Sequence, residues 1–322
     1  MQTISIVMAT YNGAKYIVEQ LDSIILQSVK PDEMIIVDDG STDETISILE
    51  RYSYNYSWIK VFKNSKNLGV VKTFERAISL TKCDLIFFAD QDDVWFKNKI
   101  EGLISNLGDN WLVYSDSIVT DEFLNEIHAS SLQHFESGRR FSEPFDYLLG
   151  NNVTGCTMLI NRKILEHALP FPDLQIMYHD HYLAIVAVMY NKLSKYSHPL
   201  MYYRQHSFNQ SSAFREIGYA NILKNSKAMA EDLRKLTFLF IMSENRYKLD
   251  LSIATEFYLA MGHKSYPTLT LIYQLKSKLS PRMFFWFIRM ACLGKWLAYL
   301  NYNLAPIKDK IKSFLGRKHS CK

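Results

Sequence analysis

The sequence predicts an α/β fold with a mostly parallel sheet, and two features of the chain support this. Apolar stretches typical of buried strands alternate with stretches in which apolar residues recur at helical spacing. Each predicted strand runs directly into a polar cluster, and ligands of parallel α/β sheets bind at the carboxyl ends of the strands. A chain of 322 residues that is 48% hydrophobic can also bury a substantial core.

The alternation of strand and helix covers the first ninety residues. Parallel strands need long crossover connections, which are usually helices, so this order is typical of a parallel sheet with covered faces. We expect strands at residues 3–9, 33–38, 58–63 and 85–89, and helices at residues 14–27, 43–52 and 70–80. The four strand ends are then expected to line one crevice.

The most informative strand end is the fourth, where three carboxylates follow an apolar run at once: Asp90, Asp92 and Asp93. Like charges at the end of a buried strand repel and raise one another's pKa unless a cation or a ring of donors compensates them. Such an oxygen-rich group suits Mg²⁺ or Mn²⁺ better than Zn²⁺. The alternative is a turn and the N-cap of a helix that starts near residue 96, but a cap needs only one Asp. Three acids in four positions favour the metal.

The first two strand ends have local explanations as well as functional ones. Asn12-Gly13 is a strong turn signal, and Ser41 or Asp43 can cap the helix that follows the second strand. These readings leave the pair Asp38-Asp39 unexplained. In many βαβ folds a carboxylate at such a position binds the nucleoside through a hydrogen bond. GxGxxG and Walker A patterns are absent from the sequence, so dinucleotide and P-loop binding are weak readings.

The four cysteines give no sign of a disulfide framework or a zinc site, because they lie far apart without CxxC spacing. A reducing, cytoplasmic setting fits this usage best. The N-terminus enters a strand directly and lacks the pattern of a secretory signal. Residues 152–160 are expected to form a strand after a turn that contains Gly155. Cys156 in this stretch has no partner motif that would make it a nucleophile.

The C-terminal region is predicted to be helical and basic. Residues 264–322 carry twelve Lys or Arg against one acid, a net +11, which leaves −7 for the rest of a chain whose total is +4. Helical spacing covers residues 222–242 and 283–300. Arg289 and Lys295 interrupt the second stretch, which therefore lacks the ~20 consecutive apolar residues that a bilayer crossing needs.

Aromatic residues lie beside these cations, and a basic tail follows at residues 308–322. This composition predicts a helix at the interface of an anionic membrane, with about 1 kcal/mol per well-placed cation. The alternative is a helix whose aromatic side chains pack on the main domain. Nucleic acid is a less suitable partner for the basic region, because no recognised nucleic-acid-binding motif accompanies the charge.

Four motifs occur in a fixed order: Ala-Thr-Tyr-Asn-Gly at 9–13, Val-Asp-Asp-Gly-Ser-Thr-Asp at 37–43, Asn-x-x-Asn-Leu-Gly at 64–69 and Ala-Asp-Gln-Asp-Asp-Val-Trp at 89–95. In this order and spacing they resemble glycosyltransferase family 2, an inverting family with the Rossmann-like GT-A fold. The resemblance covers residues 1–210, which we expect to form a GT-A domain, with residues 211–322 as a separate helical region. Within the family, the chain looks most similar to bacterial enzymes that add rhamnose or a similar sugar to O-antigen or capsule.

The resemblance implies roles for individual residues at the strand ends. The nucleotide is expected to contact Ala9, Thr10 and Tyr11, with Asp39 on the base. The weaker correspondence of Lys66 or Asn67 implies contact with the base or diphosphate. The donor and a Mg²⁺ or Mn²⁺ ion are expected at the DxD-type element: Asp90 and Asp92 for the donor, and Asp92 and Asp93 nearest the metal.

The resemblance also implies a catalytic residue and a closing loop in the second half. Asp180, at the start of a late helix, matches the family's catalytic acid residue. Without the resemblance such an Asp would be interpreted as an N-cap, and with it catalysis is favoured. His179 and His181 flank it, and either tune its pKa, contact the acceptor or are structural. In the segment 202–210, Arg204 is a candidate for phosphate binding and His206 for metal or phosphate, the alternative being a surface loop without ligand.

The expectation for the whole chain is therefore an inverting, metal-dependent glycosyltransferase that moves a sugar, such as rhamnose from dTDP-rhamnose, onto a glycan hydroxyl. The expected acceptor is lipid-linked, and the expected location is the cytoplasmic face of the membrane. The alternative is a non-catalytic nucleotide-sugar binding or scaffold protein of the same fold. The presence of both the three carboxylates and Asp180 argues against that alternative.

Overall fold

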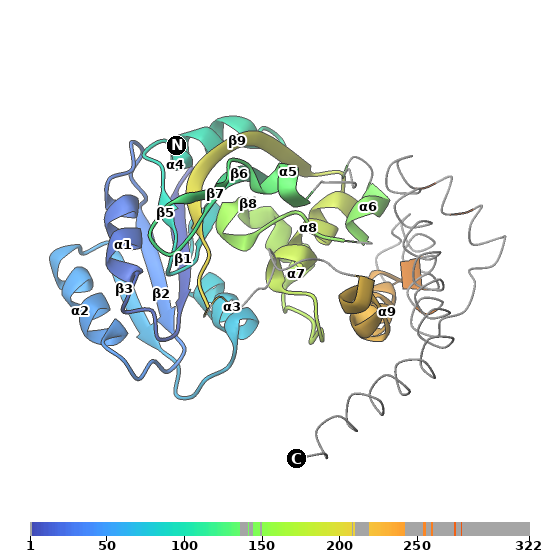
Figure 1. The fold of residues 1–322 in the computed structure, drawn as a ribbon, viewed down its shortest axis with the longest axis horizontal. Helices are drawn as coiled ribbons and strands as arrows, with labels where there is room; N and C mark the ends of the chain where they lie inside the picture. The colour runs from blue at the N-terminus through green and yellow to red at the C-terminus, as the bar shows by residue number, and fades with distance from the viewer. Residues whose placement is uncertain are drawn as a thin grey trace, which may run out of the picture.

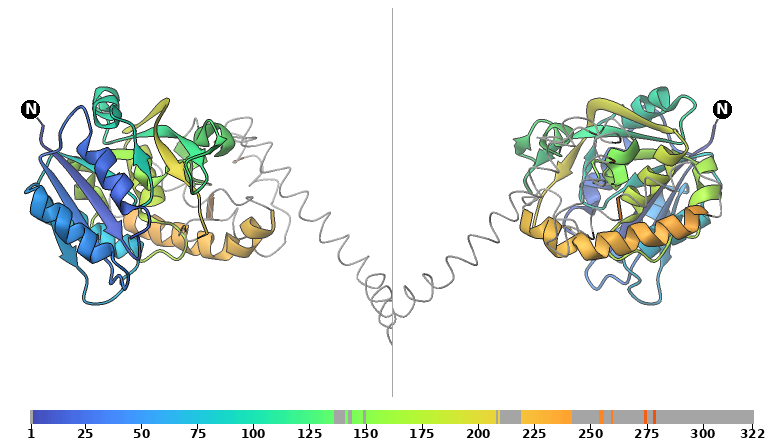
Figure 2. Two further views of the ribbon diagram at one scale, coloured as in Figure 1. Left: turned by 60° about the vertical axis from the view of Figure 1, so that its left-hand side comes forward. Right: turned by 90° about the vertical axis from the view of Figure 1, so that its right-hand side faces the viewer.

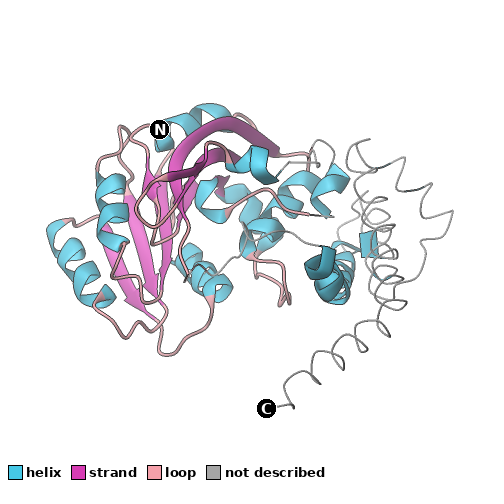
Figure 3. Cartoon of the chain, in the orientation of Figure 1, coloured by secondary structure: helices cyan, strands magenta, loops and turns pink. Residues whose placement is uncertain are grey.

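The computed structural model describes residues 2–135, 141, 144–148, 150–207, 209 and 219–241, together with positions 254, 255, 259, 274 and 278. Within these residues the chain forms one nine-stranded sheet in the order β3-β2-β1-β4-β8-β6-β9-β5, with β7 paired to β6. Helices lie on both sides of this sheet (Figure 1, Figure 3). This arrangement of one sheet covered by helices confirms the predicted α/β class.

The first half follows the predicted alternation closely. Its strands β3, β2, β1 and β4 pair in parallel. The elements are β1 Ile4–Thr10, α1 Ile17–Ile25, β2 Glu33–Asp38, α2 Thr45–Asn55, β3 Ile59–Lys63, α3 Val70–Leu80 and β4 Leu85–Ala89. The strand alternation places successive side chains of β1 on opposite faces, so Ile6 and Met8 pack toward α1 and α2 while Val7 packs toward α3.

The second half continues the sheet with mixed strand directions. Strand β8 is antiparallel to both β4 and β6, whereas β9 is parallel to β6 and antiparallel to β5. The long β9 arches over the sheet (Figure 1). The elements are β5 Val94–Trp95, α4 Lys99–Leu107, β6 Leu112–Thr120, β7 Glu126–His128, α5 Ser131–Phe135, α6 Pro144–Leu148, η1 Gly155–Thr157, β8 Met158–Asn161, η2 Arg162–Ile164, α7 Leu165–Ala168, α8 His179–Met189, β9 Leu193–Arg204 and α9 Tyr219–Ile241.

Two local expectations are refined by the structure. The stretch at 152–160 is a short 3-10 turn followed by β8, so the strand starts only at Met158. The helix expected near residue 96 starts at Lys99 and has Asn98 as its N-cap. None of the three carboxylates after β4 therefore caps that helix, although residues 91 and 92 do form a turn.

Helix α9 shares the core of the main domain. Ala230, Leu233 and Leu236 are buried in the same cluster as α3 and α8. Asp232 is fully buried and accepts hydrogen bonds from three successive backbone N–H groups, at residues 175, 176 and 177. Figure 2 shows α9 lying along one side of the folded body. The chain beyond residue 210 thus contributes at least one helix to the fold of the first part.

The remaining predictions for the C-terminal region, the helix at 283–300 and the basic tail at 308–322, lie outside the residues that the structure describes. Among the described helices, none is both long enough and apolar enough to cross a bilayer.

Candidate active site

One cavity of about 540 Å³ opens at the carboxyl ends of β1, β2 and β4. The strand ends expected to share a crevice do so, because the parallel pairing brings these ends to one edge of the sheet. The predicted site residues that line the cavity are Ala9, Thr10, Tyr11, Asp39, Asn67, Asp90, Asp92, Asp180 and His206. Asp93 and Arg204 lie behind its wall.

The two acids after β2 have separate tasks. Asp38 forms the turn: its carboxylate accepts hydrogen bonds from Thr10 Oγ1 at 2.9 Å and from the backbone N–H groups of Gly40 and Ser41 at 3.1 and 2.9 Å. The turn itself needs glycine, because Gly40 has a φ of +89°. Asp39 is the acid that faces the cavity.

Asp39 also fixes the segment 64–69 beside it. Its Oδ1 accepts from Asn64 Nδ2 and from Leu68 N, at 2.7 and 2.8 Å, and its Oδ2 accepts from Gly69 N at 2.9 Å. An ionised carboxylate offers about four lone-pair positions, so capacity for one further donor remains. This arrangement fits a carboxylate that accepts a hydrogen bond from the base of a nucleotide.

Gln91, which the sequence analysis did not single out, ties the first and fourth strand ends together. Its Oε1 accepts from Tyr11 N at 2.9 Å, and its Nε2 donates to Tyr11 O at 3.1 Å. A Cβ atom on Gly13 would lie 2.3 Å from the same Oε1, so a larger residue there would displace the Gln91 side chain. The position of Gln91 between the acids of the fourth motif was the one sequence signal that could have identified it.

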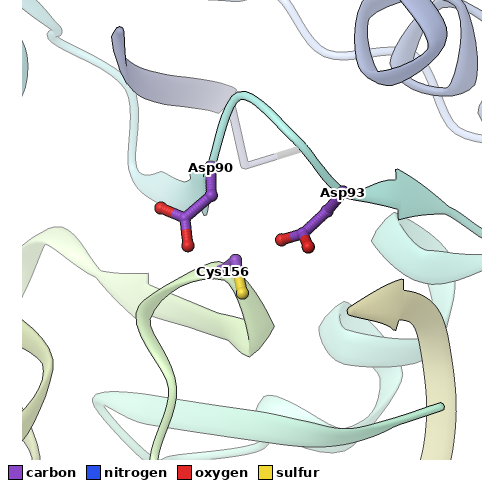
Figure 4. Close-up of side chains that lie close together, drawn as sticks. All are labelled: Asp90, Asp93 and Cys156. Carbon is purple, nitrogen blue, oxygen red and sulfur yellow. The ribbon is translucent and has the colours of Figure 1, made fainter. Parts of the chain in front are cut away.

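Three side chains come together at the cavity wall: Asp90, which is partly exposed, and the buried Asp93 and Cys156. The carboxylates of Asp90 and Asp93 point toward the Cys156 thiol (Figure 4), with one potential ligand atom from each within 4.8 Å of the others. Burial, together with the charge of neighbouring Asp92, raises the pKa of Asp90 to about 7 and holds the pKa of Asp93 well above its usual range. Burial and the two carboxylates also raise the pKa of the thiol, which keeps Cys156 protonated and unsuited to nucleophilic attack.

The protein supplies part of the compensating charge itself, through Lys99. This side chain is fully buried; its ammonium donates to Cys156 O at 2.5 Å and lies 4.0 Å from the centre of the Trp95 ring. Burial lowers the pKa of Lys99 to about 8, while Asp93 and Asp90 oppose that shift. The ammonium therefore acts as an internal counter-ion to the buried carboxylates, which the sequence analysis missed.

The other two predicted metal ligands meet on the cavity side. His206 Nε2 lies 2.8 Å from Asp92 Oδ2, and the ring of Tyr16 stacks on the imidazole at 4.7 Å. Asp93, by contrast, is fully buried, and its Oδ1 accepts from the backbone N–H of Arg204 at 3.1 Å. The predicted set Asp92, Asp93 and His206 is thus split between a cavity-facing pair and a buried member.

The Arg204 guanidinium is occupied within the protein. It donates to the backbone oxygens of Asp92 and Glu122, at 2.7 and 2.6 Å, and pairs with Glu19. The side chain is 2% exposed, so contact with a diphosphate would require these bonds to be exchanged. In this conformation Arg204 holds the acidic loop and β9 together.

The residues at the cavity fit a divalent cation. Asp92 and His206 offer carboxylate oxygen and imidazole nitrogen, and Asp90 adds a second carboxylate to the lining. Adjacent ligands of an octahedral Mg²⁺ at about 2.1 Å lie about 3 Å apart, close to the 2.8 Å between the Asp92 and His206 atoms. Carboxylates whose burial disfavours ionisation also gain most from a bound cation.

Asp180 lines the same cavity from α8. Its Oδ1 accepts from His181 N at 2.6 Å, and its Oδ2 from Gly155 N at 3.2 Å. Burial raises the pKa of this carboxyl to about 6, against the opposing effect of those backbone donors. The N-cap residue of α8 is Tyr178, so Asp180 is not the capping residue that the sequence left as the alternative.

The two flanking histidines differ. His181 faces away from the cavity and its Nε2 contacts Tyr147 O at 2.8 Å, which is a structural arrangement. His179 lines the cavity.

The fold and the acidic cavity together define the protein as a glycosyltransferase that uses a nucleotide-sugar donor. The profile of glycosyl transferase family 2 matches residues 5–169, and the chain belongs to that family. The predicted family, enzyme class and GT-A fold are therefore confirmed.

Two named relatives are similar to the chain over half of its length or more. The dTDP-rhamnosyl transferase RfbG of Shigella flexneri is 34% identical over 223 residues, which is 64% of this chain and 74% of that protein. The putative teichuronic acid biosynthesis glycosyltransferase TuaG of Bacillus subtilis is 30% identical over 170 residues, 50% of this chain and 62% of that protein.

Solved structures at lower identity share the fold. The S. aureus TarS structure with UDP-GlcNAc has a TM-score of 0.54 at 18% identity, covering 90% of this chain and 81% of that one. The mannosyltransferase PcManGT from Pyrobaculum calidifontis, in complex with GDP-Man and Mn²⁺, has a TM-score of 0.53 at 16% identity, covering 92% and 87%.

Proposed function

We propose that the protein is an inverting, metal-dependent glycosyltransferase that moves rhamnose from dTDP-rhamnose to a hydroxyl of a lipid-linked surface glycan. The observation that carries this proposal is the joint position of Asp90, Asp92 and Asp180 on one cavity at the carboxyl ends of the strands. The reaction needs two functions, and this arrangement provides both. The acidic site would hold the cation that stabilises the leaving diphosphate, and the separate, partly buried carboxylate of Asp180 deprotonates the acceptor.

The nucleotide is assigned to the β1 and β2 side of the cavity. Ala9, Thr10 and Tyr11 lie at the carboxyl end of β1. Asp39, already held by three donors, presents its remaining acceptor capacity to the nucleotide base. Asn67 lines the same part of the cavity, with its Oδ1 accepting from Gly69 N at 3.2 Å. We assign Arg204 a supporting role, because its guanidinium is committed to protein acceptors.

Asp92 and His206, with Asp90 beside them, are the residues that would hold Mg²⁺ or Mn²⁺. The cation would supply positive charge at the β-phosphate as its bond to the sugar breaks. In this assignment Asp93 does not reach the cavity. Its carboxylate accepts a hydrogen bond from the backbone N–H of Arg204 and so orients the chain at that residue.

Asp180 is the proposed general base. Its carboxylate accepts the proton of the acceptor hydroxyl as that oxygen attacks the anomeric carbon from the face opposite the diphosphate. One C–O bond forms, the sugar–phosphate bond breaks, and the electron pair leaves with the nucleoside diphosphate, so the anomeric configuration inverts. A pKa raised to about 6 makes this carboxylate a stronger base than an ordinary Asp.

The identity of the donor and of the glycan rests on similarity to relatives. RfbG is named a dTDP-rhamnosyl transferase, and TuaG is named for teichuronic acid biosynthesis. Both names support a role in surface polysaccharide synthesis.

A thermal-shift panel tests the donor assignment, because a ligand that binds only the native state raises its apparent stability. We expect dTDP and dTDP-rhamnose with Mn²⁺ to raise the melting temperature more than the corresponding UDP and GDP compounds. Stabilisation by UDP or GDP compounds alone would overturn the dTDP assignment and retain the enzyme class.

Donor hydrolysis in the presence of Mn²⁺ separates catalysis from mere binding. We expect Asp180→Asn and Asp92→Asn each to abolish hydrolysis in folded protein. Asp109→Asn, at an exposed position outside the cavity lining, serves as the control and should be unchanged. Donor binding without turnover in the unaltered protein would favour the non-catalytic scaffold alternative.

The membrane-bound location is a separate part of the proposal, supported by the basic composition of residues 264–322. We expect the full chain to bind vesicles that contain anionic lipid at low salt, and removal of residues 308–322 to weaken this binding. Equal partitioning of the two chains, without preference for anionic vesicles, would contradict it.

A further inference from the structure

His179 is a buried polar side chain whose hydrogen bonds the folded protein does not complete. It is the first residue of α8, it is 6% exposed, and it borders the cavity directly beside Asp180. Neither Nδ1 nor Nε2 has a hydrogen-bond partner among the described residues. Leaving one buried donor or acceptor unsatisfied costs about 1–3 kcal/mol, so such a group in a binding cavity calls for a ligand.

The ring is held rigidly by aromatic neighbours. The Phe74 ring from α3 lies 4.4 Å from the imidazole centre, and the Phe88 ring from β4 lies 5.5 Å from it at an interplanar angle of 18°. A Cβ atom on Gly155 would lie only 3.0 Å from Nε2, so glycine leaves the space that this nitrogen needs. The imidazole is therefore fixed in place before any ligand binds.

The chemistry of the ring narrows the ligand class. Burial among apolar rings lowers the pKa of His179 to about 3, so the imidazole is neutral at physiological pH. A neutral imidazole presents one N–H donor and one acceptor nitrogen. A hydroxyl can donate to the acceptor nitrogen or accept from the N–H, whereas a phosphate oxygen can use only the N–H.

We propose that His179 is a positioning residue for the donor, and that its neutral imidazole hydrogen-bonds a ring hydroxyl of the transferred sugar. The proposal rests on the proposed function, and it adds a contact with the sugar that is distinct from the contacts with nucleotide and metal. The deep position of the ring favours the sugar of the donor over the acceptor, since the side chain is almost completely withdrawn from the surface.

His181 provides a matched comparison within the same helix. Its side chain is buried to a similar extent, 5% exposed against 6%, but its Nε2 already contacts Tyr147 O. Replacement of His181 by Phe is expected to remove this contact and to lower the melting temperature. Replacement of His179 by Phe keeps an aromatic ring between Phe74 and Phe88 and removes two unsatisfied atoms, so stability should be retained or increased.

The decisive experiment measures the binding of dTDP and of dTDP-rhamnose, each with Mn²⁺, to the full chain and to His179→Phe by calorimetry. We expect unchanged affinity for dTDP and a loss of about tenfold or more for dTDP-rhamnose. His179→Gln, which keeps an amide near the position of Nε2, should recover part of the loss. If His179 only stabilised the fold, its replacement would not weaken the binding of dTDP-rhamnose more than the binding of dTDP.

UDP-GlcNAc and GDP-mannose are measured beside dTDP-rhamnose, each against its own nucleoside diphosphate, so that the comparison does not depend on the rhamnose assignment. Equal affinity of the unaltered chain and His179→Phe for whichever nucleotide-sugar binds would overturn the role of His179 alone. A parallel loss for the nucleotide-sugar and its nucleoside diphosphate would also overturn it. Failure of all three nucleotide-sugars to bind the unaltered chain would overturn the proposed function, and the assignment of His179 with it.

Discussion

His206 Nε2 lies 2.8 Å from Asp92 Oδ2, although 114 positions separate the two residues in the chain. Strand β9 makes this contact possible, because it pairs with β5 directly after the acidic loop and delivers the segment that follows it to the cavity. The stacked ring of Tyr16 fixes the imidazole from the other side. Two potential metal ligands from distant motifs are thus held together before any metal binds.

The first prediction concerns metal affinity. We expect His206→Ala to weaken the activation of the enzyme by Mn²⁺ at least about tenfold, because one of the cavity-facing ligands is lost. The measurement is donor hydrolysis as a function of Mn²⁺ concentration. His198→Ala, at an exposed histidine on β9, the strand that precedes His206, is the control. An unchanged Mn²⁺ requirement in His206→Ala would exclude the imidazole from the metal site.

The second prediction concerns pH. The proposed base, Asp180, can accept a proton only when ionised, and burial raises its pKa to about 6. As the pH falls through that value the carboxylate takes up a proton, so kcat/KM should decrease below about pH 6, by up to tenfold for each further unit. The profile is measured at saturating Mn²⁺, with melting temperatures at each pH to separate protonation from unfolding.

Asp180→Asn provides the control for this profile. It should be inactive at every pH, and its melting temperature at pH 8 should equal or exceed that of the unaltered chain, because an ionised buried carboxylate is replaced by a neutral group. A profile that stays flat between pH 7 and pH 5 at constant stability would argue against a base with a raised pKa.

The third prediction concerns the internal counter-ion. Lys99→Met keeps much of the side-chain shape but leaves Asp90 and Asp93 without the ammonium. We expect the free energy of unfolding to fall by about 3 kcal/mol or more, because a buried charge loses its partner. Added Mn²⁺ should restore more stability in Lys99→Met than in the unaltered chain, since the cation then replaces the missing charge.

Lys97→Met, an exposed lysine two positions away, controls for the loss of a positive charge as such. Thermal unfolding of the three chains with and without Mn²⁺ is the measurement. Equal melting temperatures for Lys99→Met and Lys97→Met would show that the buried carboxylates do not depend on the ammonium.

The sequence was sufficient for the parallel half of the fold because its signals are local. Apolar runs and turn residues specify each strand and its end, and parallel pairing then necessarily brings the ends of β1, β2 and β4 together. Asp39, Asp90 and Asp92, at these strand ends, line one cavity together with Asp180 from α8. Asp180 needed the family resemblance, since an Asp at the start of a helix is more often a cap.

The parts that could not be predicted depend on contacts between distant segments. Lys99 looks like an ordinary helical lysine in the sequence, and only the packing of α4 against β8 and β9 buries its ammonium beside the acids. Arg204 has the residue type expected of a phosphate ligand, but Glu19 and two backbone oxygens occupy its guanidinium. Counting charges along the chain cannot show which of them the folded protein already neutralises.

The fourth prediction concerns the connection between α9 and the active site. Asp232 is fully buried, and its carboxylate accepts the backbone N–H groups of Gln175, Ile176 and Met177 at 2.7, 2.9 and 3.2 Å. These residues lead directly into the start of α8, where His179 and Asp180 lie. A helix beyond the predicted domain boundary at residue 210 therefore fixes the approach to His179 and to the proposed base Asp180.

Asp232→Asn replaces one of the two carboxylate oxygens with an amide that cannot accept hydrogen bonds. We expect the free energy of unfolding to fall by about 2 kcal/mol or more, because charge-assisted hydrogen bonds to buried N–H groups are lost. Donor hydrolysis should fall with it, even well below the melting temperature, since the start of α8 is no longer held in one position. Glu231→Gln, whose carboxylate pairs with Arg234 at the exposed surface, is the neighbouring control and should change neither quantity measurably. Full activity in a destabilised Asp232→Asn would mean that α9 supports the fold without positioning Asp180.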